Sequence, residues 1–596
     1  MPRMKGAEYI VDFLVREKIP YVFGICGHGT VGLLDELYNA RDKIKMISPR
    51  HEQTAGHMAD AYFRVKHQAV ATLTSCGPGS ANLVMALALA QADSSAFLAI
   101  TANVPTSQFN RSPFQEINRH YQADFPNIVR PVVKRAFQAT RVKQLPLMMR
   151  QAVTTMTSGR PGPVSLDIPF DVFQEEDDIA PEAAWNGFNL RRSGASPGDV
   201  KSTADMLLSA KSPVLFIGHG VTLSEAGNEL TELAQQLSIP VISSPNGMGC
   251  LDMTDSLSLG FIGRNGAYPA NQAGRHADLV LAIGARFDDR SSSSWLPGYS
   301  WNFPSTKLVH VDVDHAELGH NYVPDLGILA DAKTFIRQLL AEVASRNVRR
   351  QPKAGPWLER IADWRKEWDD YTRPHFASHT SPMRPERVVA DLQSVLPDDA
   401  ILSLDSGVHH NWFMQFWNAR RPQTMLNTWG FSGMGFGPSG ILGAKLAAPD
   451  RPCISVCGDG GFTMTPHVLC TAVEYNIPAV WVIWNNFAWG AIRDIQHGIF
   501  SGREIGTGFY QGSNNTPYNP DFAAWARASG VEGISITKSE DFKGALEHAI
   551  KLGKPCLLDV HVDANVRPPS TGTWSLPPIR HKEPVFGKPF VRGLAE

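Results

Sequence analysis

Two short segments in the last third of this chain carry residues whose types and spacing could bind a metal ion and a phosphorylated ligand. Gly458-Asp459-Gly460-Gly461 follows an apolar run, Cys453 to Cys457, which is typical of a buried parallel strand. Asn486 lies 27 positions after Asp459 and follows a second apolar run. Both polar residues are therefore expected at the carboxyl ends of neighbouring strands, where α/β sheets bind ligands.

These residue types favour Mg²⁺ and a diphosphate. A carboxylate and an amide oxygen suit a hard cation that prefers oxygen ligands and often shares them with substrate phosphates. Gly460 and Gly461 allow main-chain N–H groups to approach a diphosphate at a helix N-terminus. An ordinary strand-turn-helix would explain Gly-Asp-Gly alone, but it leaves the Asn485-Asn486 pair at this spacing unexplained.

Together the two segments resemble the diphosphate-binding motif of thiamine diphosphate (ThDP) enzymes. Such enzymes need a carboxylic acid that hydrogen-bonds the pyrimidine ring, so that the cofactor's own amino group can act as a base. Glu52, within Pro49 to Tyr62, fits this part and resembles the corresponding acid of the acetohydroxyacid (acetolactate) synthase catalytic subunit. A glutamate at a helix start also occurs simply as a favourable charge on the helix dipole. The assignment of Glu52 therefore depends on both motifs.

The resemblance to the acetohydroxyacid synthases covers about residues 5–565 and implies further roles. Thr74 to Asn82 is similar to their Ser-Gly-Pro-Gly loop beside the cofactor. The residues that the resemblance adds to the ThDP site are Gly407 and His409 at the diphosphate, Met434 as the apolar wedge that bends the cofactor, and Ala488 as a third metal ligand. Those it places around the substrate are Phe114, Gln115, Lys134, Ala491 and Ile495, and those it places against FAD are Arg286, Asp288 and Arg290.

Two departures from the synthase pattern alter the predicted pocket. His28 lies in Gly27-His28-Gly29, where the synthases carry Gly-Gly, and an imidazole near the thiazolium could transfer protons close to neutral pH. A histidine at this place resembles ThDP enzymes that hydrolyse cyclic 1,2-diones, although a turn residue bonded to the backbone is the simpler interpretation. Ala491 and Ile495 replace the Met and Trp of the synthases, and that Trp is tied to the choice of acceptor 2-oxoacid.

Apolar runs that alternate with helical patterns along the whole chain are typical of parallel sheets. We therefore predict an α/β protein with three doubly wound parallel-sheet domains. The predicted bounds are 1–185 for the pyrimidine-binding domain, 196–350 for a central domain suited to FAD, 380–565 for the diphosphate- and Mg²⁺-binding domain, and 566–596 for a tail.

Composition excludes several classes of protein. The 596 residues are 43% hydrophobic and 19% charged, with a net charge of −2, which gives no reason to expect nucleic acid or a membrane as partner. The richest apolar stretch, Leu83 to Ala90, is too short to span a bilayer. The seven cysteines are scattered and odd in number, and no secretory signal opens the chain, so we expect a cytoplasmic protein.

The predicted activity is carboligation: a 2-oxoacid loses CO₂ and the remainder is joined to a second carbonyl compound, with Glu52, His28 and Gln115 as catalytic residues. Because the two half-sites lie in separate domains, we expect a homodimer or homotetramer. One alternative is a ThDP-dependent hydrolase or lyase that cleaves a C–C bond of a diketone or 2-hydroxy carbonyl compound. A catalytically silent relative would have no need of the intact Glu52, Met434, Asp459 and Asn486. A dinucleotide-binding dehydrogenase is disfavoured because no Gly-x-Gly-x-x-Gly motif opens a helix after the first strand.

Overall fold

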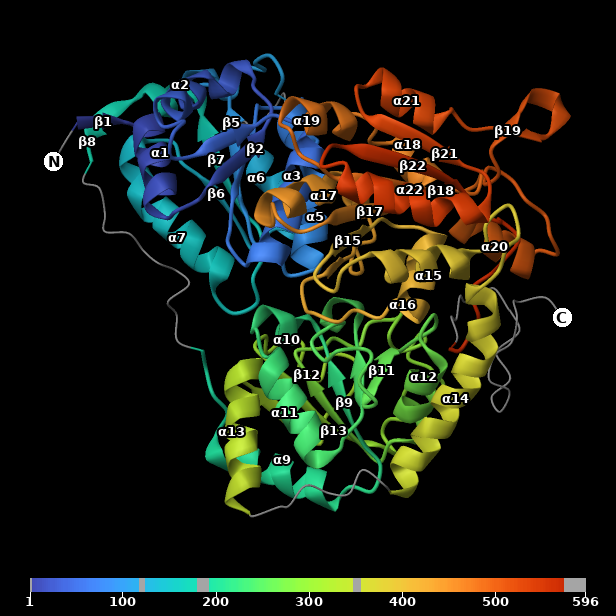
Figure 1. Cartoon of the computed structure of the whole chain (residues 1–596). Helices are drawn as coiled ribbons and strands as arrows, with labels where there is room; N and C mark the ends of the chain where they lie inside the picture. Colours follow the sequence, from blue (N-terminus) through green and yellow to red (C-terminus); the bar gives the residue numbers. More distant parts are fainter. Residues whose placement is uncertain (1–2, 117–123, 180–191, 347–354, 573–596) are drawn as a thin grey trace.

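The computed structural model describes residues 3–116, 124–179, 192–346 and 355–572, so residues 117–123 and most of the predicted tail lie outside the described residues. Three six-stranded sheets, each with only parallel pairings between its strands, follow one another along the chain. The first (blue to teal) and third (orange to red) lie side by side above the second (green) in Figure 1. The predicted fold class, three doubly wound parallel-sheet domains, is confirmed.

The first sheet has the strand order β3-β2-β4-β5-β7-β6. Its strands are β2 (Tyr21–Gly24), β3 (Lys45–Ile47), β4 (Ala71–Thr74), β5 (Leu98–Asn103), β6 (Arg135–Gln138) and β7 (Val164–Pro169). The helices are α1 (Gly6–Arg16), α2 (Val31–Asn39), α3 (Glu52–Lys66), α4 (Pro78–Ala81), α5 (Val84–Ala92), α6 (Phe125–Val129), α7 (Leu145–Thr157) and α8 (Phe170–Gln174). A two-stranded antiparallel ribbon, β1 (Arg3–Lys5) with β8 (Glu176–Asp178), closes this unit on its outer side.

The second sheet has the order β11-β10-β9-β12-β13-β14, so the chain reverses direction across the sheet between β9 and β12. Its strands are β9 (Pro213–Ile217), β10 (Val241–Ser243), β11 (Ser258–Phe261), β12 (Leu279–Ile283), β13 (Lys307–Asp312) and β14 (Leu326–Leu329). The helices are α9 (Pro197–Ser209), α10 (His219–Leu223), α11 (Gly227–Leu237), α12 (Tyr268–His276) and α13 (Ala332–Ser345). The long helix α14 (Pro356–Phe376) then runs along the edge of this unit up to the third one (Figure 1).

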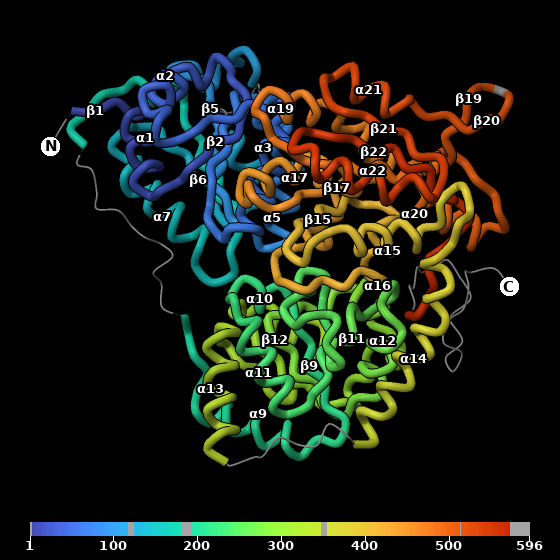
Figure 2. The backbone as a smooth tube through the Cα atoms, viewed as in Figure 1, coloured from blue at the N-terminus to red at the C-terminus, as the bar shows by residue number. Residues whose placement is uncertain are grey.

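The third sheet has the order β16-β15-β17-β18-β22-β21. Its strands are β15 (Ile401–Leu404), β16 (Met425–Leu426), β17 (Cys453–Gly458), β18 (Val480–Asn485), β21 (Glu532–Ile536) and β22 (Cys556–His561). The helices are α15 (Pro385–Val395), α16 (Val408–Phe416), α17 (Phe436–Ala447), α18 (Asp459–Thr463), α19 (Val468–Glu474), α20 (Gly490–Ile499), α21 (Phe522–Ala528) and α22 (Ser539–Lys551). A small ribbon of β19 (Tyr510–Gln511) and β20 (Thr516–Pro517) projects at the outer end (Figure 2).

The first and third units are joined by close packing of α3 against α17, which lie next to each other in Figure 2. Small residues allow the two helices to approach each other closely, since a Cβ built on Gly443 would lie 2.0 Å from the carbonyl oxygen of Met58. Thr54 and Ser439 hydrogen-bond across the same contact at 3.1 Å. The N-termini of both helices are thereby fixed relative to each other, and Glu52 and Met434 lie at or just before those two N-termini.

A buried charge cluster ties all three units together. Arg64 on α3 pairs with Asp60 at 2.7 Å and with Asp93 at 3.3 Å, and both carboxylates are fully buried. Arg64 also donates to the carbonyl of Asn427, and the Gly430 N–H donates to Asp93. His219 Nδ1, from the second unit, donates to the Asp93 carbonyl at 3.0 Å. Arg64 and Asp93 of the first unit are therefore hydrogen-bonded to the second unit through His219 and to the third unit through Asn427 and Gly430.

Removing the positive charge of this cluster should strongly destabilise the protein. In Arg64→Leu, two carboxylates would stay buried without their cation, and breaking such a group lowers the free energy of unfolding by about 3–5 kcal/mol. Chemical denaturation followed by circular dichroism measures this loss. The control is Arg50→Met, whose ion pair with Glu474 also joins the first and third units but is about half exposed. That variant should lose less than about 1 kcal/mol, and equal losses would contradict the argument.

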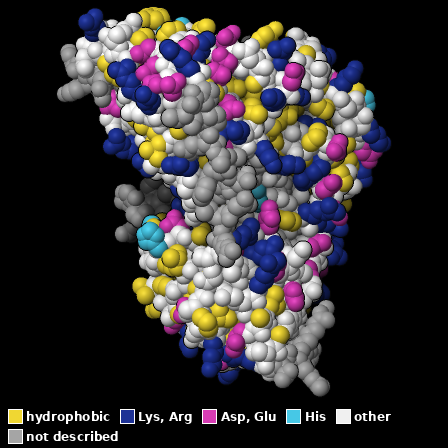
Figure 3. Space-filling model, turned by 90° about the vertical axis from the view of Figure 1, so that its left-hand side faces the viewer, with side chains coloured by type: hydrophobic (Ala, Val, Ile, Leu, Met, Phe, Trp, Pro, Cys, Tyr) yellow, Lys and Arg dark blue, Asp and Glu magenta, His cyan; other side chains and the backbone are white. Residues whose placement is uncertain are grey.

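The surface shows no segregation of charge on the face drawn in Figure 3, where acidic and basic side chains are interspersed with apolar ones. Among the described residues, none of the helices combines the length and apolarity that crossing a membrane would require.

Candidate active site

Asp459 and Asn486 lie next to each other at the carboxyl edge of the third sheet. β17 ends at Gly458 and β18 at Asn485, and the two strands are paired in parallel, with Gly458 opposite Trp484. Asp459 is 1% exposed, and burial raises the pKa of its carboxyl to about 6. The parallel pairing of β17 and β18 therefore brings Asp459 and Asn486, the two predicted metal ligands, to the same edge of the sheet.

The two neighbouring asparagines have different tasks. Asn485 donates to Asp559 on β22 at 2.9 Å and accepts from Asn519 at 2.7 Å. Asn519 also donates to Asp459 Oδ2 at 2.8 Å, while the other carboxylate oxygen accepts from the Gly460 N–H. Asn485 thus holds the strand end together, and Asn486 faces the cavity described below.

His409 provides a second polar group at this edge. Its imidazole is 1% exposed, burial lowers its pKa to about 4, and its Nε2 has no hydrogen-bond partner among the described residues. Gly407, with φ of 159°, precedes it, and a Cβ on Gly407 would lie 2.7 Å from the His409 ring. A buried polar atom without a partner is costly, so His409 Nε2 is suited to bond a ligand.

Met434 is positioned by a carboxylate that the sequence motifs did not single out. Asp405, at the end of β15, accepts the N–H groups of Gly435 at 2.9 Å and Gly437 at 3.2 Å. These bonds fix the tight turn, with Gly435 at φ 93°, that leads from Met434 into α17. In the sequence, the only sign of this role is that Asp405 directly follows a short strand. An aspartate at such a place fits an ordinary helix cap equally well.

One cavity of about 570 Å³ collects all residues predicted in the third unit. The predicted residues that line it are Gly407, His409, Met434, Asp459, Gly460, Gly461, Asn486, Ala488, Ala491 and Ile495. Arg264 and Asn265 from the second unit and Arg567 also line it. α20, which carries Ala491 and Ile495, has only partly buried or exposed residues, so this wall of the cavity is incompletely covered in the single chain. None of the described lining residues comes from the first unit.

The predicted acid Glu52 lies in the first unit, at the first position of α3. Asn82 donates to its Oε2 at 2.9 Å, and a Cβ on Gly79 would lie 3.2 Å from its Oε1. The Thr74 to Asn82 loop therefore orients the carboxyl of Glu52. Its side chain is half-exposed and does not line the 570 Å³ cavity of its own chain.

His28, Phe114 and Gln115 meet in a second cluster of the first unit. His28 opens a short 3₁₀ turn after β2 and is exposed. Its ring lies 6.1 Å from that of Phe114, which is 79% exposed. Cys76 joins them, because its sulfur lies 3.6 Å from His28 Nε2 and 3.8 Å from Gln115 Oε1. The sequence motifs gave Cys76 no role of its own.

Lys134 is placed differently from the other predicted substrate residues. Its ammonium donates to the carbonyls of Ser158 at 2.7 Å and Arg160 at 2.8 Å. Burial lowers its pKa to about 8. In the single chain Lys134 therefore holds the turn before β7, and its predicted contact with substrate stays a prediction.

A larger cavity, of about 1210 Å³, lies where the second sheet reverses its strand order, a common ligand site of α/β sheets. Arg286 and Asp288 line it, as do Arg160 and Trp429 from the other two units. Arg290 lines the 570 Å³ cavity instead, with its guanidinium 3.7 Å from the centre of the Trp429 ring. The three residues predicted against FAD are thus divided between two neighbouring cavities.

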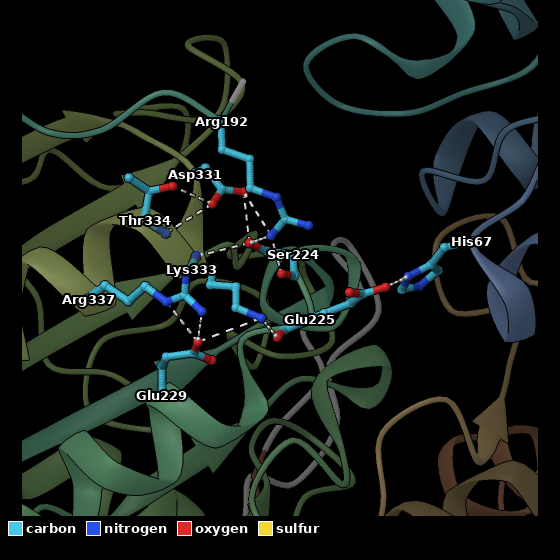
Figure 4. A network of polar contacts seen from close by, with 9 residues as sticks. All are labelled: His67, Arg192, Ser224, Glu225, Glu229, Asp331, Lys333, Thr334 and Arg337. Atoms are coloured by element: carbon cyan, nitrogen blue, oxygen red, sulfur yellow. Dashed lines mark hydrogen bonds and ion pairs between the residues drawn. The ribbon is translucent and has the colours of Figure 1, made fainter. Parts of the chain in front are cut away.

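Five residues that line this larger cavity, His67, Arg192, Ser224, Glu225 and Asp331, belong to the polar network drawn in Figure 4. His67, at the end of α3, contacts Glu225 at 3.4 Å, which links the first unit to the second. Ser224 donates to Asp331 at 2.7 Å and accepts from Arg192 at the same distance. Behind them, Glu229 pairs with Lys333 and Arg337. Basic and acidic side chains are therefore paired along this network, and Arg192, Glu225 and Asp331 are its charged members that line the cavity.

Comparison with known families agrees with this geometry. Three family models match the chain: "Thiamine pyrophosphate enzyme, N-terminal TPP binding domain" over residues 4–123, the central domain of the same enzymes over 200–339, and their C-terminal TPP binding domain over 405–560. Each match falls on one of the three sheets.

Relatives of known name are similar over nearly the whole chain. A probable acetolactate synthase large subunit of Methanocaldococcus jannaschii is 34% identical, with 98% of this chain and 97% of that protein covered. The acetolactate synthase large subunit of Haemophilus influenzae is 32% identical over 94% and 95%, and isozyme 3 of Escherichia coli is 30% identical over 95% and 96%. The chain belongs to the thiamine pyrophosphate enzymes, in the family of the acetolactate synthase large subunits.

Proposed function

We propose that this protein is a ThDP- and Mg²⁺-dependent carboligase that decarboxylates a 2-oxoacid and joins the remainder to a second carbonyl compound. The observation that carries the proposal is the convergence of Asp459, Asn486, His409 and Met434 on one cavity. The names of the relatives, acetolactate synthase large subunits, support the same reaction.

The residues present fit both groups. Asp459, Asn486 and the carbonyl of Ala488, all from residues that line the cavity, would supply only oxygen ligands, which would suit Mg²⁺ rather than a metal that prefers sulfur. The unpartnered Nε2 of His409 and the N–H groups at the start of α18 would bond the diphosphate. When bound, ThDP supplies an electron sink for the carbon that loses CO₂. The protein's own share is to orient the reactants and exclude water.

The two half-sites support a homodimer as the smallest active unit. Glu52 and the His28 cluster do not line the cavity of their own chain, and α20 leaves one wall of that cavity incompletely covered. A second copy that brings its first unit against this wall would complete the site, with Glu52 at the pyrimidine ring. His28 would then transfer protons, and Phe114, Gln115 and Lys134 would line the path of the substrate. Two such dimers would form the tetramer.

The larger cavity supports FAD as a further ligand. Its volume of about 1210 Å³ exceeds that of ordinary ligand pockets, about 300–1,000 Å³. Gly218 packs closely against Gly284 just before α10, and Arg160, Arg192 and Arg286 in the lining could bond the diphosphate of a dinucleotide. We propose Arg286 and Asp288 as contacts of FAD in this cavity. We also propose a cytoplasmic location for the protein, which its seven free cysteines support.

Product analysis tests the proposed reaction. The protein is incubated with ThDP and Mg²⁺ and with pyruvate, glyoxylate or a cyclic 1,2-dione, and CO₂ and coupled products are measured. Carboligation predicts CO₂ release together with a new hydroxy-oxo product from the 2-oxoacids. Ring opening of the dione without CO₂ would instead favour the hydrolase that the histidine of Gly27-His28-Gly29 resembles.

His28→Gly sharpens this test, because it restores the Gly-Gly pattern of the synthases. If the imidazole transfers protons, turnover of the native substrate should fall by about 10²–10⁴-fold and the pH–rate profile should lose one limb. The affinity for ThDP should stay unchanged, since the diphosphate site lies in the third unit. Full activity with an unchanged profile would make His28 only a turn residue. His28→Ala serves as the control for the added backbone freedom of glycine.

A further inference from the structure

The one cysteine that lies in the predicted catalytic cluster is Cys76. It is 2% exposed and follows β4, at the start of the loop that carries Asn82 to Glu52. Its sulfur contacts His28 Nε2 at 3.6 Å and Gln115 Oε1 at 3.8 Å, both within the range of hydrogen bonds to sulfur. The thiol is therefore the one atom that joins the two polar residues of this cluster.

The backbone holds this arrangement in place from both sides. Gly77 has φ of 58°, and a Cβ there would lie 1.8 Å from the carbonyl oxygen of Gln115. Gln115 itself has φ of 64°, in the left-handed region that only a minority of residues occupy. On the other side, a Cβ on Gly27 would lie 2.4 Å from the Ser75 side chain. The turn with His28 and the loop with Gln115 are thus both pressed against the segment Ser75 to Gly77.

The number of protons available on the thiol and the imidazole fixes the direction of these two hydrogen bonds. An amide oxygen can only accept, so the bond to Gln115 Oε1 uses the single proton of the thiol. The sulfur can then meet His28 Nε2 only as an acceptor, which requires the proton of a neutral imidazole on Nε2. Burial raises the pKa of the Cys76 thiol, which keeps it protonated and argues against a nucleophilic thiolate.

We propose that Cys76 is a positioning residue: its sulfur holds the imidazole of His28 in the tautomer with the proton on Nε2, and so leaves Nδ1 as the basic nitrogen. The same thiol fixes the amide of Gln115, so that both predicted catalytic side chains of this unit are oriented through one atom. The catalytic consequence rests on the proton transfer proposed for His28, whereas the tautomer can be measured without any substrate.

The tautomer is tested by NMR on the full chain labelled with ¹⁵N-histidine. His28 is one of 19 histidines, and the spectrum of His28→Ala identifies its signals by difference. At a pH where the ring is neutral, wild type should show the Nε2-protonated form, and Cys76→Ala should show a mixture of both tautomers. A wild-type His28 protonated on Nδ1, or a spectrum that Cys76→Ala leaves unchanged, would overturn the proposal. This arm holds even if the proposed carboligation is wrong.

A double-mutant cycle tests the consequence for activity. Cys76→Ala should lower kcat/KM about tenfold, the effect of losing roughly one hydrogen bond, and should shift the limb of the pH profile that belongs to His28. In the His28→Ala background the same change should have no effect. An equal loss in both backgrounds would show a merely structural role and would refute positioning.

Two further variants control for packing. Cys76→Ser keeps a donor and an acceptor at the same place, so it should retain most of the activity and the Nε2 tautomer. Cys26→Ala removes an exposed cysteine two positions before His28 and should change neither the spectrum nor the rate. ThDP affinity and the melting temperature show whether each variant is folded, and if Cys76→Ala does not fold, Cys76→Val is compared with Cys76→Ser in the same two assays.

Discussion

Asp459→Ala is expected to abolish Mg²⁺-dependent retention of ThDP and, with it, all measurable turnover. The carboxylate is the only charged member of the proposed donor set, beside the amide of Asn486 and the carbonyl of Ala488. A hard divalent cation depends on that charge to leave water. Isothermal titration with ThDP in the presence and absence of Mg²⁺ measures the loss, and the fold is checked by circular dichroism.

The matched control is Asp494→Asn, since Asp494 is another acid that lines the same cavity but pairs with Arg567 at 3.5 Å. This variant should retain ThDP within about twofold, because it removes a charge from the cavity without touching a strand-end ligand. Undiminished ThDP binding in Asp459→Ala, or an equal loss in both variants, would refute the metal assignment.

Glu52→Gln should bind ThDP yet turn over about 10²–10⁴-fold more slowly, the usual contribution of acid–base catalysis. The amide is nearly isosteric with the carboxyl and keeps one oxygen for the Asn82 amide, which now donates to Glu52 Oε2. What it removes is the acid that assists the cofactor's amino group. Hydrogen–deuterium exchange at the thiazolium C2 measures this directly. Glu36→Gln, at a partly exposed position of α2 that lines neither cavity, should exchange at the wild-type rate.

The same variant decides whether two chains share the site. When Glu52→Gln and Asp459→Ala are mixed and reassembled, half of the dimers should be mixed, and each should contain one intact site of two. About one quarter of the wild-type activity should therefore return. No recovery would show that Glu52 and Asp459 of one chain serve the same site, which would contradict the proposed arrangement.

Central strands of the three sheets can be recognised in the sequence more readily than most of the edge strands. β17 and β18 are buried along almost their whole length, so they read as continuous apolar runs. β6, β14 and β21 lie at sheet edges and alternate between exposed and buried residues over only four or five positions. β16, two residues long, has no detectable pattern. Pairing partners, which the sequence does not reveal, define these strands.

Helix starts are harder to recognise in the sequence than strand ends. Thr465 and Pro466 have the residue types of a helix cap and first position, but α19 begins at Val468. The residues between are used in tight turns, since the Thr465 N–H donates to Phe462 and the Val468 N–H to Thr465. A separate short helix, α18, already begins at Asp459 and takes the position next to the predicted diphosphate.

The candidate site was predictable where its residues follow neighbouring strands along a motif. Asp459 and Asn486 meet because β17 and β18 are adjacent, which the spacing indicated. Asp405, Asn519 and Cys76 were missed because each acts across a distance in sequence that no local pattern records. Asn519, for example, reaches Asp459 from 60 positions away. Such supporting contacts depend on tertiary packing alone.

The charge cluster around Arg64 also sets an order of events during protein synthesis. Asn427, whose carbonyl accepts from this guanidinium, is translated 363 residues after Arg64, and Gly430 follows Asp93 by 337 residues. A nascent first unit therefore carries two carboxylates and one guanidinium that must stay hydrated until the ribosome has delivered the second unit and the beginning of the third. The amino-terminal segment can form its sheet early, but it can exclude water from this cluster only after the segment with Asn427 and Gly430 has been synthesised.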